Sequence, residues 1–389
     1  MANTENTERY LALKKYNPWL WLKLKIKKQL GWIGTPKLIP YRGYANENTI
    51  YLTGYLTEDK GLEKPTAKQT TWENAVSMLK RYTSDNLPKV DLKASVGSQQ
   101  IETRTAENGL FKCELPNSGS FSESQNQWKK YLVKFPEEMI ATTKNQSTEG
   151  EFLVPGTNHE FAVISDIDDT IIVSHSTQWF RKLWLMLFRN SRTRKPFPGV
   201  DTFYQALQQG KSGQNENPFF YVSSSEWNLY DLLDDFCTHN QLPKGVLLLR
   251  ELEASIFQLR KSGGGNHEHK YEKIKHLFEV YPTMNFILIG DNGQRDPEIY
   301  ERIATEFPNR VKSIYIRTVR KRKHAERDLE IRLKLEQMGV PFVASATSIE
   351  AAKHAAKYGI ISPGSVQKIE IDAQKDQENP LTKKVFEKE

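Results

Sequence analysis

Residues Phe161-Ala-Val-Ile-Ser-Asp166-Ile-Asp168-Asp169-Thr170-Ile-Ile172 run from apolar side chains into three carboxylates and then become apolar again. A short run rich in Val and Ile predicts a buried strand, most often in a parallel sheet. Open parallel α/β sheets bind their ligands beyond the carboxyl ends of the strands. We therefore expect Asp166, Asp168 and Asp169 at the mouth of a functional site.

Clustered carboxylates at a strand end are costly, because like charges a few ångströms apart resist joint ionisation. A hard divalent cation such as Mg²⁺ removes this cost, and it binds one or two carboxylates together with substrate phosphate. The same residue types also form Asx-rich turns that cap helices, in which Asp and Thr side chains satisfy backbone donors. A cation site, unlike such a turn, would require further phosphate-binding and metal-binding groups downstream in the sequence.

Three downstream segments supply the other groups that a phosphoryl-transfer site needs. Pro218-Phe-Phe-Tyr-Val222 predicts a second strand, and Ser223-Ser-Ser225 at its end offers hydroxyls to a phosphate oxygen. Asn285-Phe-Ile-Leu-Ile-Gly290 predicts a third strand, which Asp291-Asn-Gly-Gln-Arg-Asp296 follows. Lys270 lies between them at the start of a helical pattern. Each group alone is more often a turn residue or a solvated lysine, but the ordered set favours a phosphatase site.

This order of groups resembles the haloacid dehalogenase (HAD) superfamily of Mg²⁺-dependent phosphatases, which act through an aspartyl phosphate. Three motifs are similar to one branch, the phosphatidate phosphatase family typified by the yeast actin-patch enzyme, which has many bacterial members. Glu226 departs from that branch, because the family pattern has Pro at this point. The motifs are Ser165-Asp-Ile-Asp-Asp-Thr-Ile171, Phe220-Tyr-Val-Ser-Ser-Ser-Glu-Trp227 and Leu288-Ile-Gly-Asp-Asn-Gly-Gln-Arg-Asp-Pro-Glu-Ile-Tyr300, with Tyr41-Arg-Gly-Tyr44, Leu79-Lys-Arg-Tyr82 and Asp85 upstream.

The resemblance implies a role for each matching residue. Asp166 would be the nucleophile that takes the phosphoryl group as an aspartyl phosphate. Asp168 would protonate the leaving alcohol oxygen and later activate water. Ser223 and Lys270 would hold the non-bridging phosphate oxygens, and Lys270 would also offset the charge of Asp166.

Mg²⁺ is the cofactor that the resemblance implies. Asp166, Asp291 and Asp296 would bind it together with the backbone carbonyl of Asp168. Asp169 is interpreted as a turn residue beside the site, with a metal or polar support role as the alternative.

Other polar residues near the motifs have less definite interpretations. Thr170 and Ser224 are further candidates for substrate contact, and Ser224 competes with Ser223 for the phosphate. His267 and His269 flank the candidate lysine, and we interpret them as solvated loop residues because no Cys or third His accompanies them.

Two segments, residues 18–32 and 179–189, combine basic and aromatic side chains. This composition is typical of a segment at a membrane interface, and the alternative is a helix that packs on its own domain with Lys and Arg at its edges. Trp179 and Trp184 would then form a ledge for acyl chains beside the site. A phospholipid substrate and an anionic membrane surface are therefore the expected partners. Nucleic acid is not expected, because no recognised binding motif accompanies the net charge of +7.

Composition indicates a globular enzyme with more than one domain. The chain has 389 residues, of which 26% are charged, and a mean hydropathy of −0.63. The two cysteines, Cys113 and Cys237, lie far apart without metal-ligand spacing, so a disulfide framework is not indicated. A signal peptide is not evident, and no apolar run is long enough to span a bilayer, which predicts a cytoplasmic protein that binds membranes peripherally.

The expected elements divide the chain into four parts. Residues 1–35 form a basic aromatic segment, and residues 36–155 are expected to be an all-β, sandwich-like domain with a helical period at 72–82. Residues 158–345 are expected to be an α/β, HAD-like domain with a doubly wound, mostly parallel sheet. Residues 346–389 are expected to hold a C-terminal helix and a polar tail, disordered from Pro363 onward. The expected strands are 50–56, 90–96 and 110–115 in the first domain and 161–165, 219–222, 246–249, 286–289 and 311–316 in the second.

We predict a Mg²⁺-dependent phosphatidate phosphatase of lipid metabolism, which forms diacylglycerol and phosphate through an aspartyl phosphate. One alternative is a related phosphatase that acts on a soluble phosphomonoester. The other is a non-catalytic membrane or cytoskeletal adaptor that keeps the fold. Acyl-chain preference, oligomeric state and protein partners do not follow from the sequence.

Overall fold

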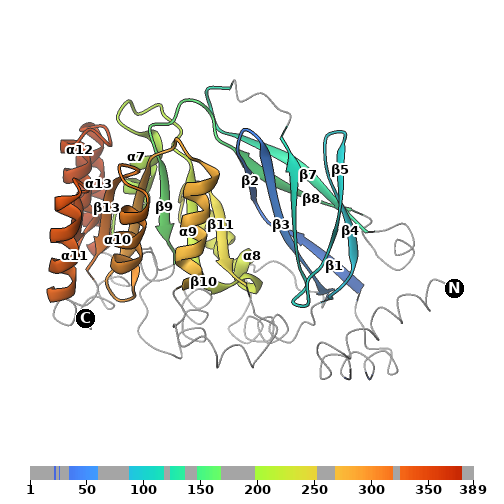
Figure 1. Cartoon of the computed structure of the whole chain (residues 1–389). Coiled ribbons are helices and arrows are strands. Elements are labelled where there is room, and N and C mark those ends of the chain that lie inside the picture. Colours follow the sequence, from blue (N-terminus) through green and yellow to red (C-terminus); the bar gives the residue numbers. More distant parts are fainter. Residues whose placement is uncertain are drawn as a thin grey trace. The chain divides into compact units, whose positions relative to one another are not determined.

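The computed structural model describes residues 22, 26, 35–59, 87–117, 123–135, 147–167, 198–251, 268–318 and 325–378. The chain divides into two compact units, one with strands β1 to β8 and the other with strands β9 to β14 and helices α7 to α13 (Figure 1). The expected helical period at 72–82, the segment 179–189 and all of the segment 18–32 except residues 22 and 26 lie outside the described residues.

One mixed, eight-stranded sheet forms the first unit. Its strand order is β1-β3-β2-β8-β7-β4-β5, and β6 pairs with β3 beside this path. β2 and β8 are parallel, whereas β1, β2 and β6 are antiparallel to β3. The strands expected at 50–56, 90–96 and 110–115 are confirmed as β3, β4 and β6. The strands are Thr35–Pro40 (β1), Gly43–Ala45 (β2), Thr49–Asp59 (β3), Asp91–Val96 (β4), Gln99–Arg104 (β5), Leu110–Pro116 (β6), Gln127–Lys134 (β7) and Ser147–Val154 (β8).

Two glycines let aromatic rings pack against this sheet. A Cβ at Gly54 would lie 2.5 Å from the Phe111 ring, and a Cβ at Gly150 would lie 2.4 Å from the Tyr131 ring. Both rings are buried. The Tyr131 hydroxyl donates a hydrogen bond to the Tyr41 carbonyl at 2.6 Å, so the polar end of this ring is satisfied inside the core.

The Tyr41-Arg-Gly-Tyr44 motif joins strands of the first unit. The Arg42 Nε donates to the Glu151 carboxylate of β8 at 2.9 Å. Tyr44 of β2 stacks on Tyr51 of β3, with ring centroids 5.1 Å apart. These contacts explain the motif as a structural connection within the sheet.

The second unit has a six-stranded sheet in which all strand pairs are parallel. Its order is β11-β10-β9-β12-β13-β14, so the direction in which successive strands are added reverses between β9 and β12. All five expected strands are confirmed, and β14 is a short sixth strand that the sequence did not predict. The strands are Ala162–Asp166 (β9), Phe219–Glu226 (β10), Val246–Arg250 (β11), Phe286–Asp291 (β12), Val311–Arg317 (β13) and Phe342–Ser345 (β14).

Helices cover both faces of this parallel sheet (Figure 1). Phe219 contacts Tyr204 of α7, whereas Phe220 contacts Tyr281 just after α9, each with ring centroids 5.7 Å apart. Successive strand residues point to opposite faces, so α7 and α9 lie on opposite faces. Helices α12 and α13 pack with α7, and α10 and α11 continue from α9. The helices are Val200–Gln209 (α7), Tyr230–His239 (α8), Glu268–Val280 (α9), Asp296–Glu306 (α10), Ala325–Gln337 (α11), Ser348–Lys357 (α12) and Gly364–Glu378 (α13), with a 3₁₀ turn at Trp227–Leu229.

Helix α13 corrects the expectation that the chain is disordered from Pro363 onward. Ile369 and Ala373, four residues apart on one face of this helix, are buried. Gly199 is the residue directly before α7, and a Cβ at this position would lie 3.0 Å from the Cβ of Ala373. The Gly199 amide donates to the buried Asp376 carboxylate at 3.1 Å. A polar composition suggested disorder, but the buried apolar face of this helix and the contact of Asp376 with Gly199 hold it against α7.

In the part of the chain that the structure describes, no helix has the length and apolar character needed to cross a membrane.

The packing of α13 can be tested by comparing two isoleucines on the same helix. Ile369 is 0% exposed, whereas Ile371 is 44% exposed. Ile369→Ala should lower the free energy of unfolding by about 2–5 kcal/mol, because it removes buried methyl groups and leaves a cavity. Ile371→Ala should change it by less than about 0.5 kcal/mol. Urea unfolding measures both, and equal effects of the two substitutions would contradict the docked helix.

Candidate active site

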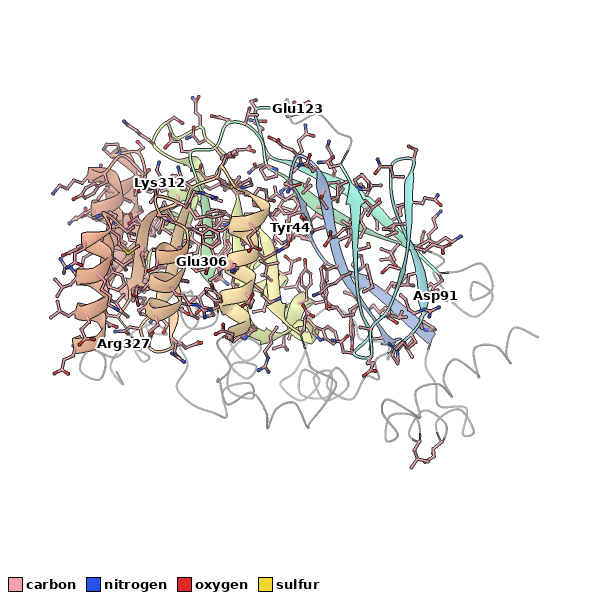
Figure 2. All side chains as sticks on the ribbon, viewed as in Figure 1. Tyr44, Asp91, Glu123, Glu306, Lys312 and Arg327 are labelled. Atoms are coloured by element: carbon pink, nitrogen blue, oxygen red, sulfur yellow. The ribbon has the colours of Figure 1, made fainter. Side chains whose placement is uncertain are left out.

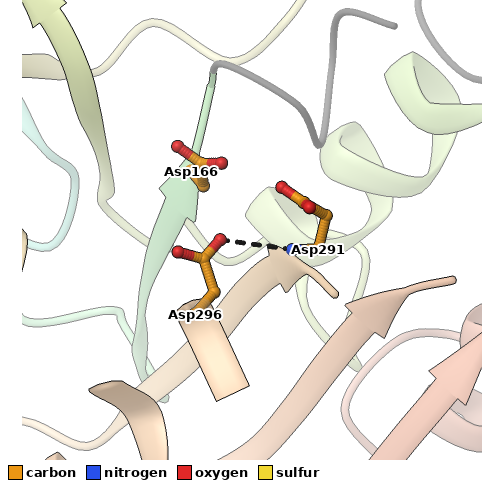
Figure 3. A group of neighbouring side chains, drawn as sticks. All are labelled: Asp166, Asp291 and Asp296. Atoms are coloured by element: carbon orange, nitrogen blue, oxygen red, sulfur yellow. Dashed lines mark hydrogen bonds between the residues drawn. The ribbon is translucent and has the colours of Figure 1, made fainter. Parts of the chain in front are cut away.

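The reversal between β9 and β12 brings three carboxylates together. Asp166 ends β9, Asp291 ends β12 and Asp296 begins α10. Each offers an oxygen within 4.8 Å of the others, and all three side chains are buried (Figure 3). Open parallel sheets bind their ligands at such a reversal. The cluster therefore occupies the position in this sheet where a functional site is expected.

Gly290 makes room for Asp296. A Cβ at residue 290 would lie 2.5 Å from Oδ2 of Asp296 and 2.8 Å from its Cβ. The Tyr300 hydroxyl of α10 donates to the Ile289 carbonyl of β12 at 2.8 Å. The Asp291 amide donates to Oδ2 of Asp296 at 3.2 Å (Figure 3). The start of α10 is thus held against the end of β12.

Asp291 is oriented by the loop that follows it. Its Oδ1 accepts hydrogen bonds from the amide of Gly293 at 2.6 Å and from the amide of Gln294 at 3.2 Å. Side-chain to backbone bonds of this kind fix a carboxylate relative to its own loop.

Lys270 brings a positive charge to the carboxylates. It lies in the first turn of α9, and its side chain is fully buried. Its Nζ lies 3.1 Å from Oδ1 of Asp166 and 2.6 Å from Oδ1 of Asp296. A buried ammonium is tolerated only when it is paired and hydrogen-bonded. Here two carboxylates from different elements provide that compensation.

The excess of negative charge affects the protonation of Asp296. Burial raises the pKa of Asp296 to about 7, against the lowering effect of Lys270 and with a further rise from the charge of Asp166. Lys270 contributes one positive charge against three carboxylates, so the cluster can accept a further cation. Carboxylate oxygens at this separation are the ligands that a hard divalent cation such as Mg²⁺ prefers.

Ser223 follows the residue of β10 that pairs with Asp166 in the sheet. Val222 of β10 is paired with Asp166 of β9, and the pairing of β10 with β11 shifts between Val222 and Glu226. Ser223 is fully buried, and its hydroxyl oxygen accepts a hydrogen bond from the Ser225 amide at 2.9 Å. This hydroxyl is at the same end of the sheet as the carboxylate cluster.

His269 is not the solvated loop residue that the sequence suggested. It lies on α9 beside Lys270, and burial, followed by the nearby charge of Lys273, lowers its pKa to about 4. Its ring forms a hydrogen bond with the backbone of Ser223. His269 therefore connects α9 to the end of β10, while His267 lies outside the described residues.

Comparison with known proteins finds a similar family for the part of the chain that carries this cluster. Residues 161–318 match the family described as phosphatidate phosphatase APP1, catalytic domain. This part of the chain is therefore similar to the phosphatidate phosphatase APP1 family. The matched range contains the whole carboxylate cluster and Lys270.

Two fungal relatives extend this comparison. The chain is 28% identical over 236 residues to phosphatidate phosphatase APP1 of Saccharomyces cerevisiae, an alignment that covers 60% of this chain and 37% of the yeast protein. It is 26% identical over 159 residues to an uncharacterized protein of Schizosaccharomyces pombe, covering 41% of this chain and 25% of the relative. The chain therefore spans well under half of the length of either relative.

Solved structures are more distant. A carbohydrate acetylesterase from Xanthomonas citri covers 77% of this chain and 74% of its own, with 9% identity and a TM-score of 0.26. Similarity at this level supports no conclusion about fold or function.

The second unit brings some of the sequence-predicted residues together. Four of them meet in the cluster, namely Asp166, Lys270, Asp291 and Asp296, and Ser223 and Ser224 lie at the end of β10. Asp168, Asp169, Thr170, Trp179 and Trp184 lie outside the described residues. The roles assigned to all these residues stay predictions.

Sequence reasoning missed residues that hold the cluster in place. Tyr300 anchors α10, and Arg327 of α11 reaches the loop after Asp291. The motif at 288–300 includes Asp291 and Tyr300 but gives no role to Tyr300, and none of the motifs includes Arg327.

The protonation of Asp296 predicts a pH effect in the protein without bound metal. The pKa of Asp296 is raised from 3.8 to about 7 in the folded state, so folding takes up a proton between these pH values. As pH rises from about 4 to about 7, the free energy of unfolding of the wild type should therefore fall relative to that of Asp296→Asn. Urea unfolding at several pH values in the presence of a chelator measures this difference. Parallel pH curves for the two proteins would contradict the assignment.

Proposed function

We propose that this protein is a Mg²⁺-dependent phosphatidate phosphatase, which releases diacylglycerol and phosphate through an aspartyl phosphate on Asp166. The observation that carries the proposal is the buried cluster of Asp166, Lys270, Asp291 and Asp296 inside the residues that match the APP1 catalytic domain. A soluble protein core does not bury this many charged groups together unless they pair or bind a cation. The name of the yeast relative supports phosphatidate as the substrate.

Three of these carboxylates would hold the metal. Asp166, Asp291 and Asp296 would bind Mg²⁺ together with the backbone carbonyl of Asp168. Their oxygen-only, net negative donor set fits a hard cation. When bound, Mg²⁺ would offset the charge of the phosphoryl oxygens and orient them for in-line displacement.

The side chains of the protein would carry the two chemical steps. Asp166 would attack the phosphorus atom, and the bond to the diacylglycerol oxygen would break as Asp168 donates a proton to that oxygen. Asp168 would then take a proton from the water that attacks the aspartyl phosphate, which releases phosphate and restores Asp166.

Other side chains would hold the phosphoryl group in position. Lys270, with its Nζ 3.1 Å from the Asp166 carboxylate, would pair with the non-bridging phosphate oxygens next to the nucleophile. The Ser223 hydroxyl would donate to the same oxygens, and Thr170 and Ser224 are further candidates for this contact.

The architecture of the second unit supports a HAD-like, doubly wound domain. The chain-order reversal and the helices on both faces of a parallel sheet are the features that such a domain requires. We assign residues 158–345 to this domain and residues 36–155 to an accessory, sandwich-like β domain.

The lipid substrate depends on additional features of the chain. The basic aromatic segments at 18–32 and 179–189 would lie at an anionic membrane surface, and Trp179 and Trp184 would contact acyl chains. The protein would then act from the cytoplasm as a peripheral membrane enzyme.

The first test is phosphate release from phosphatidate in mixed micelles and from a soluble sugar phosphate, with and without Mg²⁺. The wild type should release phosphate from the lipid only when Mg²⁺ is present. Asp166→Asn should lower the rate by about 10³-fold or more, because it removes the nucleophile. Asp91→Asn is the matched control, since Asp91 pairs with Arg104 on the surface of the first unit and should have little effect.

The other outcomes separate the alternatives. Release from the sugar phosphate alone would indicate a phosphatase for soluble esters and reject the lipid substrate. No release from either substrate would favour a membrane or cytoskeletal adaptor. Full activity of Asp166→Asn would reject the covalent mechanism.

A further inference from the structure

Helix α11 contacts the loop that carries Asp291, although this helix lies outside the family match at residues 161–318. Arg327, in the first turn of α11, donates from Nη2 to the carbonyl of Asn292 and from Nη1 to the carbonyl of Gln294, each at 3.2 Å. In Figure 1 the β9 arrow points toward one end of the second unit. Figure 2, in the same view, shows Arg327 at that end. A side chain from outside the matched range therefore reaches the loop of the cluster.

The peptide unit between Asn292 and Gly293 connects Arg327 with Asp291. The carbonyl of this unit accepts a hydrogen bond from Arg327, and its N–H donates to Oδ1 of Asp291 at 2.6 Å. The carbonyl and the N–H rotate together, because the peptide unit is planar. A rotation of this unit would break both hydrogen bonds, so Arg327 restrains the Asp291 carboxylate through one peptide unit.

Asp328 holds Arg327 and the loop together. Its Oδ1 accepts from Nη2 of Arg327 at 2.8 Å, and its Oδ2 accepts from the side-chain amide of Asn292 at 2.9 Å. Asn292 is buried, and its backbone amide donates to the Arg317 carbonyl at the end of β13 at 3.0 Å. The position of the loop is thus fixed from both α11 and β13.

We propose that Arg327, oriented by Asp328, is a positioning residue for the binding of a divalent cation at Asp291. The inference rests on the proposed function, because it takes the carboxylate cluster as the cation site. Groups that orient metal ligands from behind typically contribute about 10- to 100-fold in metal affinity. Arginine suits this position, since its planar guanidinium donates in fixed directions to two carbonyls, which a lysine ammonium does less well.

A purely structural role for Arg327 has a different signature. Arg327 also pairs with Glu298 of α10 at 3.2 Å, and both side chains are partly exposed. Loss of this pair alone would lower the stability of the protein slightly and leave its cation affinity unchanged. Cation affinity of the folded protein therefore separates the two roles.

The test compares Arg327→Ala with Arg332→Ala in the full chain. Arg332 lies on the same helix and pairs with Glu336 at 2.7 Å on the surface, so its removal is a matched control. Mn²⁺ binding, followed by electron paramagnetic resonance without substrate, should weaken by about 10-fold or more in Arg327→Ala. The Mg²⁺ concentration for half-maximal phosphatase activity should rise by a similar factor, while the rate at saturating Mg²⁺ stays close to that of the wild type. Arg332→Ala should match the wild type in all three measurements.

Two further variants keep the inference testable if Arg327→Ala does not fold. Arg327→Lys should bind Mn²⁺ with an affinity between those of the wild type and the alanine variant, and Asp328→Asn should also weaken binding. Wild-type Mn²⁺ affinity in Arg327→Ala, or in both Arg327→Lys and Asp328→Asn, would overturn the inference. A wild-type protein that binds no Mn²⁺ would instead contradict the proposed metal site itself.

Discussion

The buried contact between Lys270 and two carboxylates is the interaction on which the site depends. The ammonium of Lys270 lies between Asp166 of β9 and Asp296 of α10 and has no access to solvent. Taking charges out of water is costly, and removal of one partner leaves the others uncompensated. The cluster therefore requires β9, α9 and α10 to be in place together, and it couples the assembly of the domain to the assembly of the site.

Sheet topology determines which residues take part in this contact. The order of chain addition reverses between β9 and β12, and ligands of open parallel sheets bind at such a reversal. Gly290 then allows the start of α10 to approach β12 closely enough for Asp296 to reach the amide of Asp291. Each charged group comes from a different element, so small displacements of one helix would change the separation of the carboxylates.

Much of the second unit and part of the site could be predicted from the sequence, for identifiable physical reasons. Strands buried on both faces are continuous apolar runs in the sequence. For this reason β9, β10 and β12 could be predicted, together with the polar residues at their ends. Ligands of parallel sheets bind beyond the carboxyl ends of the strands, which predicted that Asp166 lies at the mouth of a site, whereas its grouping with Asp291 came from the family resemblance. Helix α13 could not be predicted, because its burial depends on the approach of Gly199, a residue far away in the sequence. Arg327 was also missed, since its contacts with the loop after Asp291 are to the backbone carbonyls of Asn292 and Gln294, which leave no pattern of residue types in the sequence.

The most direct test of the site is the identity of the residue that carries the phosphoryl group during turnover. Asp168→Asn would slow both the formation of the aspartyl phosphate and its hydrolysis, so this variant and the wild type can each be mixed with phosphatidate and Mg²⁺ for a series of times, quenched with acid and digested for mass spectrometry. We expect one phosphoryl group on Asp166, lost on treatment with hydroxylamine, as acyl phosphates are. A phosphoryl group on another residue would contradict the assignment of Asp166 as the nucleophile, around which the whole site has been interpreted.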